Sequence, residues 1–305
     1  MKFPNCNVPL LGVDGVSTEV SRKLQRREPF SLIRLGDGEG ALLALNELST
    51  EEDREYFQRH FGPQENLLGK IWRLQSWLTT SIQDADIIGV RDDVVGVNFP
   101  CIHNELPHNE FLREFRTRFN LRPPDLRLPY EAARRIALLS CALAKIEFNR
   151  NQKFCSAWAH YGLQRSGALA NLISMQNHVG LISCRKELPK ILASSFGVDV
   201  DFYHIPCMFK DTPKSLAPTN QFDRLEELLE TGFKKSRGIL YLVGAGLFGK
   251  VYCSHIKKQG GVALDLGSLL DAWVGLPTRP AVYQSMFADD NYIGGVPASL
   301  LLDRK

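Results

Sequence analysis

The turn Arg34-Leu-Gly-Asp-Gly-Glu-Gly40 carries the first residues whose types and spacing could do chemistry. Asp37 and Glu39 stand two positions apart and could present both carboxylates to one divalent cation, such as Mg²⁺ or Mn²⁺. Arg34 offers a planar guanidinium that suits a phosphate or a carboxylate. A second interpretation stays open, in which Asp37 caps the following helix, Glu39 favours its first turn and Arg34 pairs with either acid.

A second turn, Leu242-Val-Gly-Ala-Gly-Leu-Phe-Gly-Lys250, is rich in glycine. Its glycines match G-x-G-x-x-G, a pattern typical of a dinucleotide-binding turn when an acid follows about twenty residues later, as Asp265 does here. It also matches G-x-x-x-x-G-K, but Val251 replaces the Ser or Thr of a phosphate-binding P-loop, which excludes the standard form. We expect backbone N–H groups here to bind a phosphate, or the glycines to serve packing alone. The glycines are Gly244, Gly246 and Gly249.

A third group lies in Ala263-Leu-Asp-Leu-Gly-Ser-Leu-Leu-Asp-Ala-Trp273. Asp265 ends an expected strand, and Gly267 begins the turn that follows it. A carboxylate at a strand end can bind a sugar hydroxyl or accept its proton. We favour that role for Asp265, and helix capping for Asp271.

Strands alternate with helices along much of the chain, and each strand is a short, nearly continuous apolar run. This pattern predicts an α/β fold with a Rossmann-like, mostly parallel sheet, helices on both faces and helical insertions. We expect one domain over 1–305, with a βα part, a mainly helical middle, a Rossmann-like part and a tail. These parts span 17–90, 91–178, 179–275 and 276–305. The expected strands are 29–36, 85–90, 179–183, 200–205, 238–243 and 261–267.

Composition narrows the class of protein. Lys and Arg number 37 and Asp and Glu 34, so the formal net charge is only +3 and a nucleic-acid partner is not expected. No apolar run is long enough to span a membrane, and the first residues do not resemble a secretory signal. Seven cysteines without a C-x-x-C pair indicate a reducing compartment, so we expect a cytoplasmic protein. Paired basic residues, such as Arg134-Arg135, predict solvated helix faces that could touch a membrane surface.

Taken together, the three groups resemble the GT-D fold glycosyltransferases, a nucleotide-sugar transferase family first catalogued as a domain of unknown function. The segment FSLIRLGDGEGALL resembles the family's N-terminal signature, an arginine, a glycine and an Asp-x-Glu motif after the first strand. The segment ILYLVGAGLFGKVYCSHIKKQGGVALDLGSLLDAW resembles the distal half, in which a glycine turn precedes a strand ending in Asp-x-Gly. The matching residues are Arg34, Gly36, Asp37 and Glu39, and then Asp265 and Gly267.

The resemblance spans most of 29–275 and implies a UDP-sugar donor, with Mn²⁺ or Mg²⁺ held by Asp37 and Glu39. We therefore expect a metal-assisted glycosyltransferase of hexosyltransferase type, with Asp265 as the first candidate base and Asp271 as the second. The acceptor would be a glycan, a lipid-linked sugar or a glycoprotein, as in polysaccharide biosynthesis. Residues expected to contact the substrates are Arg34, Gly36, Gly38, Gly244, Gly246, Gly267 and Asp271.

Two other functions remain open from the sequence. One is an NAD(P)- or SAM-dependent enzyme that uses the turn from Gly244 to Gly249, with Asp265 as the ribose-binding acid. The other is a non-catalytic module that binds a nucleotide or a glycan without turnover.

Overall fold

The strands form one parallel sheet in the part of the chain that the computed structural model describes, which is 9–45, 51–61, 66–91, 107–118, 130–207, 221–233, 236–276 and 278. Within these residues the sheet has eight strands in the order β1-β4-β3-β2-β8-β7-β5-β6, and each neighbouring pair is parallel. The strands are β1 (Leu10–Leu11), β2 (Phe30–Arg34), β3 (Ile87–Val90), β4 (Lys153–Ser156), β5 (His178–Ser183), β6 (Asp199–His204), β7 (Leu240–Gly244) and β8 (Val262–Asp265).

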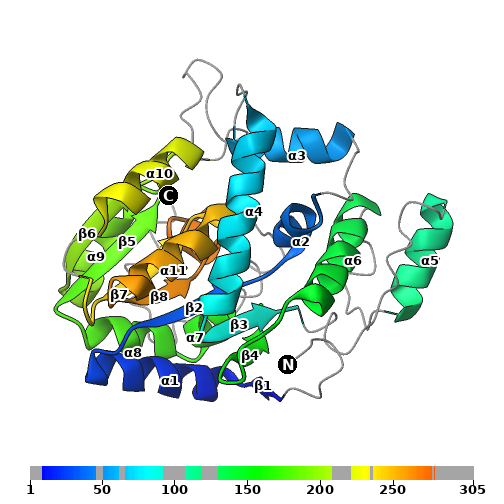
Figure 1. Ribbon diagram of the computed structural model, residues 1–305. Coiled ribbons are helices and arrows are strands. Elements are labelled where there is room, and N and C mark those ends of the chain that lie inside the picture. The colour runs from blue at the N-terminus through cyan, green and yellow to red at the C-terminus, as the bar shows by residue number, and fades with distance from the viewer. Residues whose placement is uncertain are drawn as a thin grey trace.

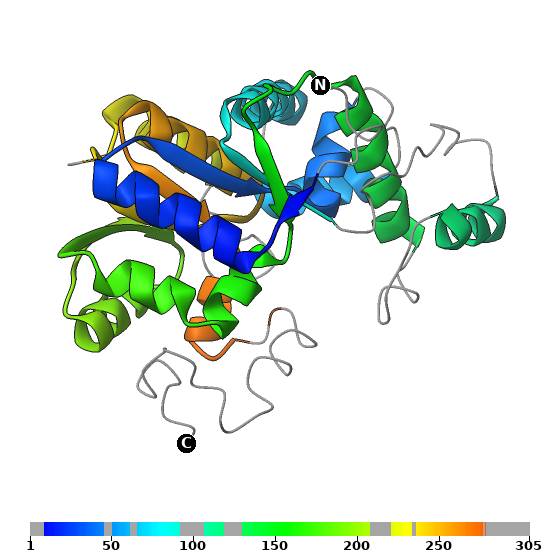
Figure 2. The same ribbon diagram turned by 90° about the horizontal axis from the view of Figure 1, so that it is seen from below.

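Helices cover both faces of this sheet (Figures 1 and 2). Beside one face lie α2 (Asp37–Leu43), α3 (Glu51–Phe61), α4 (Leu67–Asp84), α5 (His108–Arg118), α6 (Tyr130–Lys145), α10 (Gln221–Thr231) and α11 (Gly249–Lys258). Beside the other lie α1 (Val13–Arg26), α7 (Ala159–Arg165), α8 (Ala168–Ser174), α9 (Leu188–Phe196) and α12 (Leu269–Trp273). The predicted α/β fold with a parallel sheet is confirmed.

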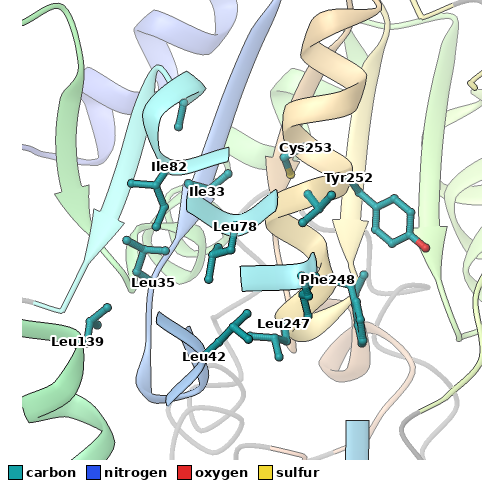
Figure 3. Packing of buried hydrophobic residues seen from close by; sticks show 14 of the residues in the cluster. Ile33, Leu35, Leu42, Leu78, Ile82, Leu139, Leu247, Phe248, Tyr252 and Cys253 are labelled. Atoms are coloured by element: carbon teal, nitrogen blue, oxygen red, sulfur yellow. The ribbon is translucent and has the colours of Figure 1, made fainter. Parts of the chain in front are cut away.

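Each strand divides its side chains between the two layers, because successive residues of a strand point to opposite faces. In β7, Tyr241 and Val243 belong to the first core, whereas Leu240 and Leu242 belong to the second. Figure 3 shows the centre of the first core, where Leu78 of α4 lies among side chains of β2 and α11. Both faces of the central strands β7 and β8 are therefore buried, which explains their continuous apolar sequence, whereas the edge strand β6 is only partly buried.

The middle of the chain forms α5, α6, α7 and α8 in its described residues, and one strand. It contributes β4, which pairs with β3 and with the short β1, and neither β1 nor β4 was expected from the sequence. Arg134 and Arg135 do not form a solvated face either, since both are buried and pair with Asp53 of α3. The helix that carries them packs its polar as well as its apolar residues into the molecule.

Other predictions lie wholly or mostly outside the described residues, namely the loop expected at 91–108, the linker at 119–129 and the tail at 276–305. The cysteines that the structure describes are free thiols, three of them buried, so these five form no disulfide framework. Among the helices it describes, none combines the length and the apolar character needed to cross a membrane.

Candidate active site

The candidate site lies where the two halves of the sheet meet. Strands β1 to β4 form one half and β5 to β8 the other, and they join through β2 and β8, which pair over Phe30–Leu32 and Val262–Leu264. The chain leaves β2 toward α2 on one face and leaves β8 toward α12 on the other. Open α/β sheets bind their ligands at such a switch point, beyond the carboxyl ends of the strands.

The acidic turn after β2 gives its two carboxylates different roles. Gly36 is the extended residue that precedes α2, and its N–H donates to Oε2 of Glu39 at 2.7 Å, which closes a capping box. Glu39 is almost fully buried. Asp37, the first residue of α2, is half-buried, and its carboxylate makes no ion pair or hydrogen bond with any residue that the structure describes. The capping role thus belongs to Glu39, and Asp37 keeps its carboxylate available.

Lys250, the second residue of α11, joins the acidic turn to the glycine turn. Its Nζ lies 2.7 Å from Oε1 of Glu39 and 3.2 Å from Oδ2 of Asp265, and it donates to the carbonyl of Gly246 at 3.0 Å. The side chain is 6% exposed. The two turns, more than two hundred residues apart in sequence, therefore meet at the end of the sheet.

Arg34 and Asp265 fix the ends of the two central strands to each other. Nε of Arg34 donates to the carbonyl of Asp265 at 2.8 Å, and its Nη2 donates to Oδ1 at 3.2 Å. The backbone N–H of Arg34 donates to Oδ2 at 3.2 Å. Asp265 is completely buried, whereas the Arg34 side chain is 14% exposed. We call Arg34, Glu39, Lys250 and Asp265 the buried charge cluster.

Glycines leave room for this cluster. Gly267 has φ +51°, and a Cβ there would overlap Nη2 of Arg34, so this position requires glycine for its backbone and for its close approach. On the other side, Cγ of Arg34 lies 3.0 Å from where a Cβ of Gly89 would stand, which lets the arginine cross β3. Gly246 also has φ +51°, but open space surrounds its α-carbon. A ligand therefore has space to bind beside Gly246.

Electrostatics keep the cluster charged. Burial acts to raise the pKa of Asp265, but Arg34 and Lys250 outweigh it and hold that pKa below its ordinary value. Burial acts to lower the pKa of Lys250, but Asp265 and Glu39 outweigh it and raise that pKa. His160 of α7 lies 3.0 Å from Nη1 of Arg34, and burial together with this arginine lowers its pKa well below the ordinary value.

The structure separates the sequence-predicted site residues into three sets. Glu39, Asp265 and Arg34 belong to the buried charge cluster, Gly36 and Gly267 lie against it, and Gly244 packs against Leu270 and Gly267. Asp37, Gly38 and Gly246 lie on the two turns, where a Cβ on Gly38 would overlap the hydroxyl of Tyr56. Asp271 is apart from these, since its Oδ1 accepts from Nε of Arg185 at 2.8 Å and its Oδ2 accepts from Thr278.

Sequence reasoning missed two residues of this site. Lys250 was visible in the G-x-x-x-x-G-K match, but only as a P-loop lysine that Val251 argued against. His160 lies in a segment with no recognisable motif, and only its contact with Arg34 shows it. Both are fully enclosed by elements distant in sequence.

The resemblance to the GT-D family implies a metal at Asp37 and Glu39, and the geometry of Glu39 does not fit that donor set. One oxygen of Glu39 accepts from Gly36 and the other lies against the Lys250 ammonium. Among the described residues, no group of three or more His, Cys, Asp or Glu is placed to hold a metal ion. A metal shared by Asp37 and Glu39 would have to displace Lys250, so that site stays a prediction.

A family model described as a GT-D fold-like domain matches residues 11–273, which include all of the sequence-predicted site residues, Lys250 and His160. No curated protein matches the sequence.

Three solved structures are similar to the chain. A selenomethionine-substituted structure of domain of unknown function 1792 is 15% identical, with 88% of this chain and 83% of that chain covered and a TM-score of 0.49. Another, described as a highly conserved domain with a distinct glycosyltransferase fold, is 14% identical, with 88% and 83% covered and a TM-score of 0.48. A glycosyltransferase (DUF1792) from Streptococcus sanguinis is 13% identical, with 86% and 82% covered and a TM-score of 0.45.

Proposed function

We propose that this chain, which belongs to the GT-D fold-like family, is a glycosyltransferase that moves a sugar from a nucleotide-sugar donor to an acceptor hydroxyl. The observation that carries the proposal is the meeting of the acidic and glycine turns at the switch point of the sheet. Glu39 of one turn and Lys250 of the other are 2.7 Å apart, and the family match covers both turns. A ligand at this edge can therefore touch both.

The donor diphosphate would lie beside the glycine turn. Open space surrounds Gly246, and α11 begins three residues later with its N-terminus toward the same edge. Backbone N–H groups and the positive end of a helix dipole favour an anion at such a place. Arg34 adds positive charge with a side chain that keeps some exposure. These features support a UDP-sugar, and a hexose in particular is part of the proposal.

The reaction forms one bond and breaks another. The acceptor oxygen bonds to the anomeric carbon, the bond from that carbon to the diphosphate breaks, and the nucleoside diphosphate leaves with the bonding electrons. Positive groups near the departing oxygen lower the energy of the transition state. Asp265 and Asp271 are both paired with arginine, so we assign to Asp37 the role of accepting the proton that the acceptor hydroxyl loses when its oxygen bonds to the anomeric carbon. Glycan, lipid-linked sugar and glycoprotein acceptors, and a cytoplasmic location, are also proposals.

Asp37→Asn tests this assignment. The variant should fold as the wild type does, because Asp37 has no described partner, and should lose on the order of 10²-fold in sugar transfer or donor hydrolysis. The assay measures UDP release from a panel of UDP-sugars. Asp14→Asn is the matched control, since Asp14 is also an acid in the first turn of a helix but lies exposed on α1. Equal activity in both variants would contradict the role of Asp37.

The NAD(P) hypothesis finds less support in the geometry. An acid that binds a ribose hydroxyl must reach the ligand, and Asp265 is completely buried between Arg34 and Lys250. A thermal-shift comparison of UDP-sugars, NADH and S-adenosylmethionine separates these hypotheses, because a ligand raises the midpoint by mass action. Stabilisation by a UDP-sugar without any UDP release would favour the non-catalytic module.

A further inference from the structure

We infer that the ammonium of Lys250 is the resident cation of this site, occupying the position at Glu39 that the family resemblance gives to a divalent metal. Only the activity measurement described below rests on the proposed function. The metal-binding measurement does not.

The surroundings of Lys250 resemble the oxygen shell of a cation. Its Nζ has an oxygen of Glu39 at 2.7 Å, the carbonyl of Gly246 at 3.0 Å and an oxygen of Asp265 at 3.2 Å. An ammonium has three N–H donors and no acceptor, so these three oxygens satisfy it completely. The side chain of Lys250 is only 6% exposed, so water cannot easily replace these oxygens as partners of the ammonium.

The charges of the cluster balance without a metal. Arg34 and Lys250 supply two positive charges, and Glu39 and Asp265 supply two negative charges. Buried charges are tolerated when they are paired and hydrogen-bonded, as here. A divalent ion bound to Glu39 would add two positive charges beside an ammonium whose remaining described partners are Asp265 and the carbonyl of Gly246. The cluster therefore opposes a metal at Glu39.

Local geometry explains why Lys250 points inward. In a P-loop this lysine reaches a bound phosphate, and the following Ser or Thr binds the metal. Here the following residue is the buried Val251, and the start of α11 packs against β8, with Oδ1 of Asp265 only 3.6 Å from where a Cβ of Gly249 would stand. The lysine at the second position of the helix consequently meets the strand-end carboxylates.

Mn²⁺ binding tests the inference without any substrate. Electron paramagnetic resonance of free Mn²⁺ is titrated against the wild type, Glu39→Gln, Lys250→Gln and the double variant. We expect Glu39→Gln to leave the wild-type Mn²⁺ affinity unchanged, because Glu39 holds no metal. Lys250→Gln should tighten Mn²⁺ binding roughly 10-fold by freeing Glu39, and the double variant should lose that gain.

Lys257→Gln is the matched control. Lys257 lies on the same helix and also pairs with an aspartate, Asp86, but its side chain is 23% exposed, so its loss should leave Mn²⁺ affinity unchanged. Tight Mn²⁺ binding by the wild type that Glu39→Gln abolishes would overturn the inference. So would a folded Lys250→Gln protein, checked by circular dichroism, with wild-type affinity.

Three further outcomes also have a defined interpretation. If Lys250→Gln does not fold, the comparison of the wild type with Glu39→Gln alone supports or overturns the inference. If the wild type transfers sugar, full activity in EDTA supports it and complete loss overturns it. If no donor is turned over under any condition, the proposed function fails, while the Mn²⁺ titration still judges the role of Lys250.

Discussion

Two arginine–aspartate pairs lie at the carboxyl edge of the sheet and differ in how far the protein encloses them. Arg34–Asp265, at the β2–β8 junction, has side-chain exposures of 14% and 0%, and Lys250 and Glu39 extend it into a cluster. Arg185–Asp271, beyond β5, has exposures of 16% and 20%, and its further described contacts are with Thr278 and Sγ of Cys207, neither of which adds a second ion pair as Lys250 and Glu39 do. An arginine and an aspartate thus form a buried ion pair at the β2–β8 junction and a partly exposed ion pair beyond β5.

The difference lies in what each aspartate must satisfy. Asp265, whose side chain is 0% exposed, accepts from the backbone and side chain of Arg34 and from Lys250. Asp271 is partly solvated, so water can replace a lost partner. Removing one member of a buried ion pair leaves its partners as uncompensated buried charges, which lowers the free energy of unfolding strongly. A pair near solvent contributes little to that free energy. The comparison therefore predicts unequal effects for equivalent substitutions.

Asp265→Asn should have the largest effect. The substitution keeps the shape but removes the charge that balances Arg34 and Lys250, so we expect a loss of about 3–5 kcal/mol in the free energy of unfolding. Urea denaturation followed by circular dichroism measures it. A loss below that of Asp271→Asn would show that the buried charge cluster is not the framework of this edge.

The protonation of His160 makes the stability of the protein depend on pH, which offers a second test of the comparison. Its folded-state pKa is lowered well below 6.5, first by burial and then by Arg34, so the unfolded chain binds a proton that the folded protein rejects. Stability is therefore retained above about pH 6.5 and falls as the pH drops below it, by at most about 1.4 kcal/mol per pH unit for this group. His160→Gln should flatten that dependence when unfolding free energies are compared between pH 7 and pH 5.

His204→Gln is the matched control for this prediction. His204 ends β6, near the Arg185–Asp271 side, and its pKa is lowered by burial, by Lys186 and by Arg224, but it is less enclosed than His160. Its substitution should remove less of the pH dependence. A larger change in His204→Gln than in His160→Gln would reverse the proposed contrast between the two regions.

Asp271→Asn should have the smallest effect. We expect a loss of about 1 kcal/mol or less in the free energy of unfolding, because Asp271 is 20% exposed whereas Asp265 is 0% exposed. The same urea titration measures it, with high salt as a further comparison, since the contribution of an accessible pair weakens with ionic strength. A loss as large as that of Asp265→Asn would mean that both pairs are structural.

Local sequence was enough to find the strands of the site and to bound them closely. The apolar runs predicted at 238–243 and 261–267 became β7 and β8, and the predicted 29–36 became β2. It was not enough for β4, Lys153–Ser156, a four-residue strand between α6 and α7 that begins with an exposed lysine and has only two buried side chains. Nor did it show that Arg134 would be buried against Asp53, because a basic pair on a helix has the same local pattern whether it is solvated or paired.

The sequence by itself determined that the sheet is parallel and that glycine-rich or acidic turns follow its strands, because hydrophobic runs and turn residues act over a few neighbouring positions. Only the tertiary structure decided that β8 lies beside β2, so that Asp265 meets Arg34 across 231 positions of chain. That adjacency changed the roles of the acids. Glu39 and Asp265 are paired with buried cations, and Asp37 keeps its carboxylate available. The reason is that the pairing and burial of a side chain depend on which distant strand lies beside its own strand.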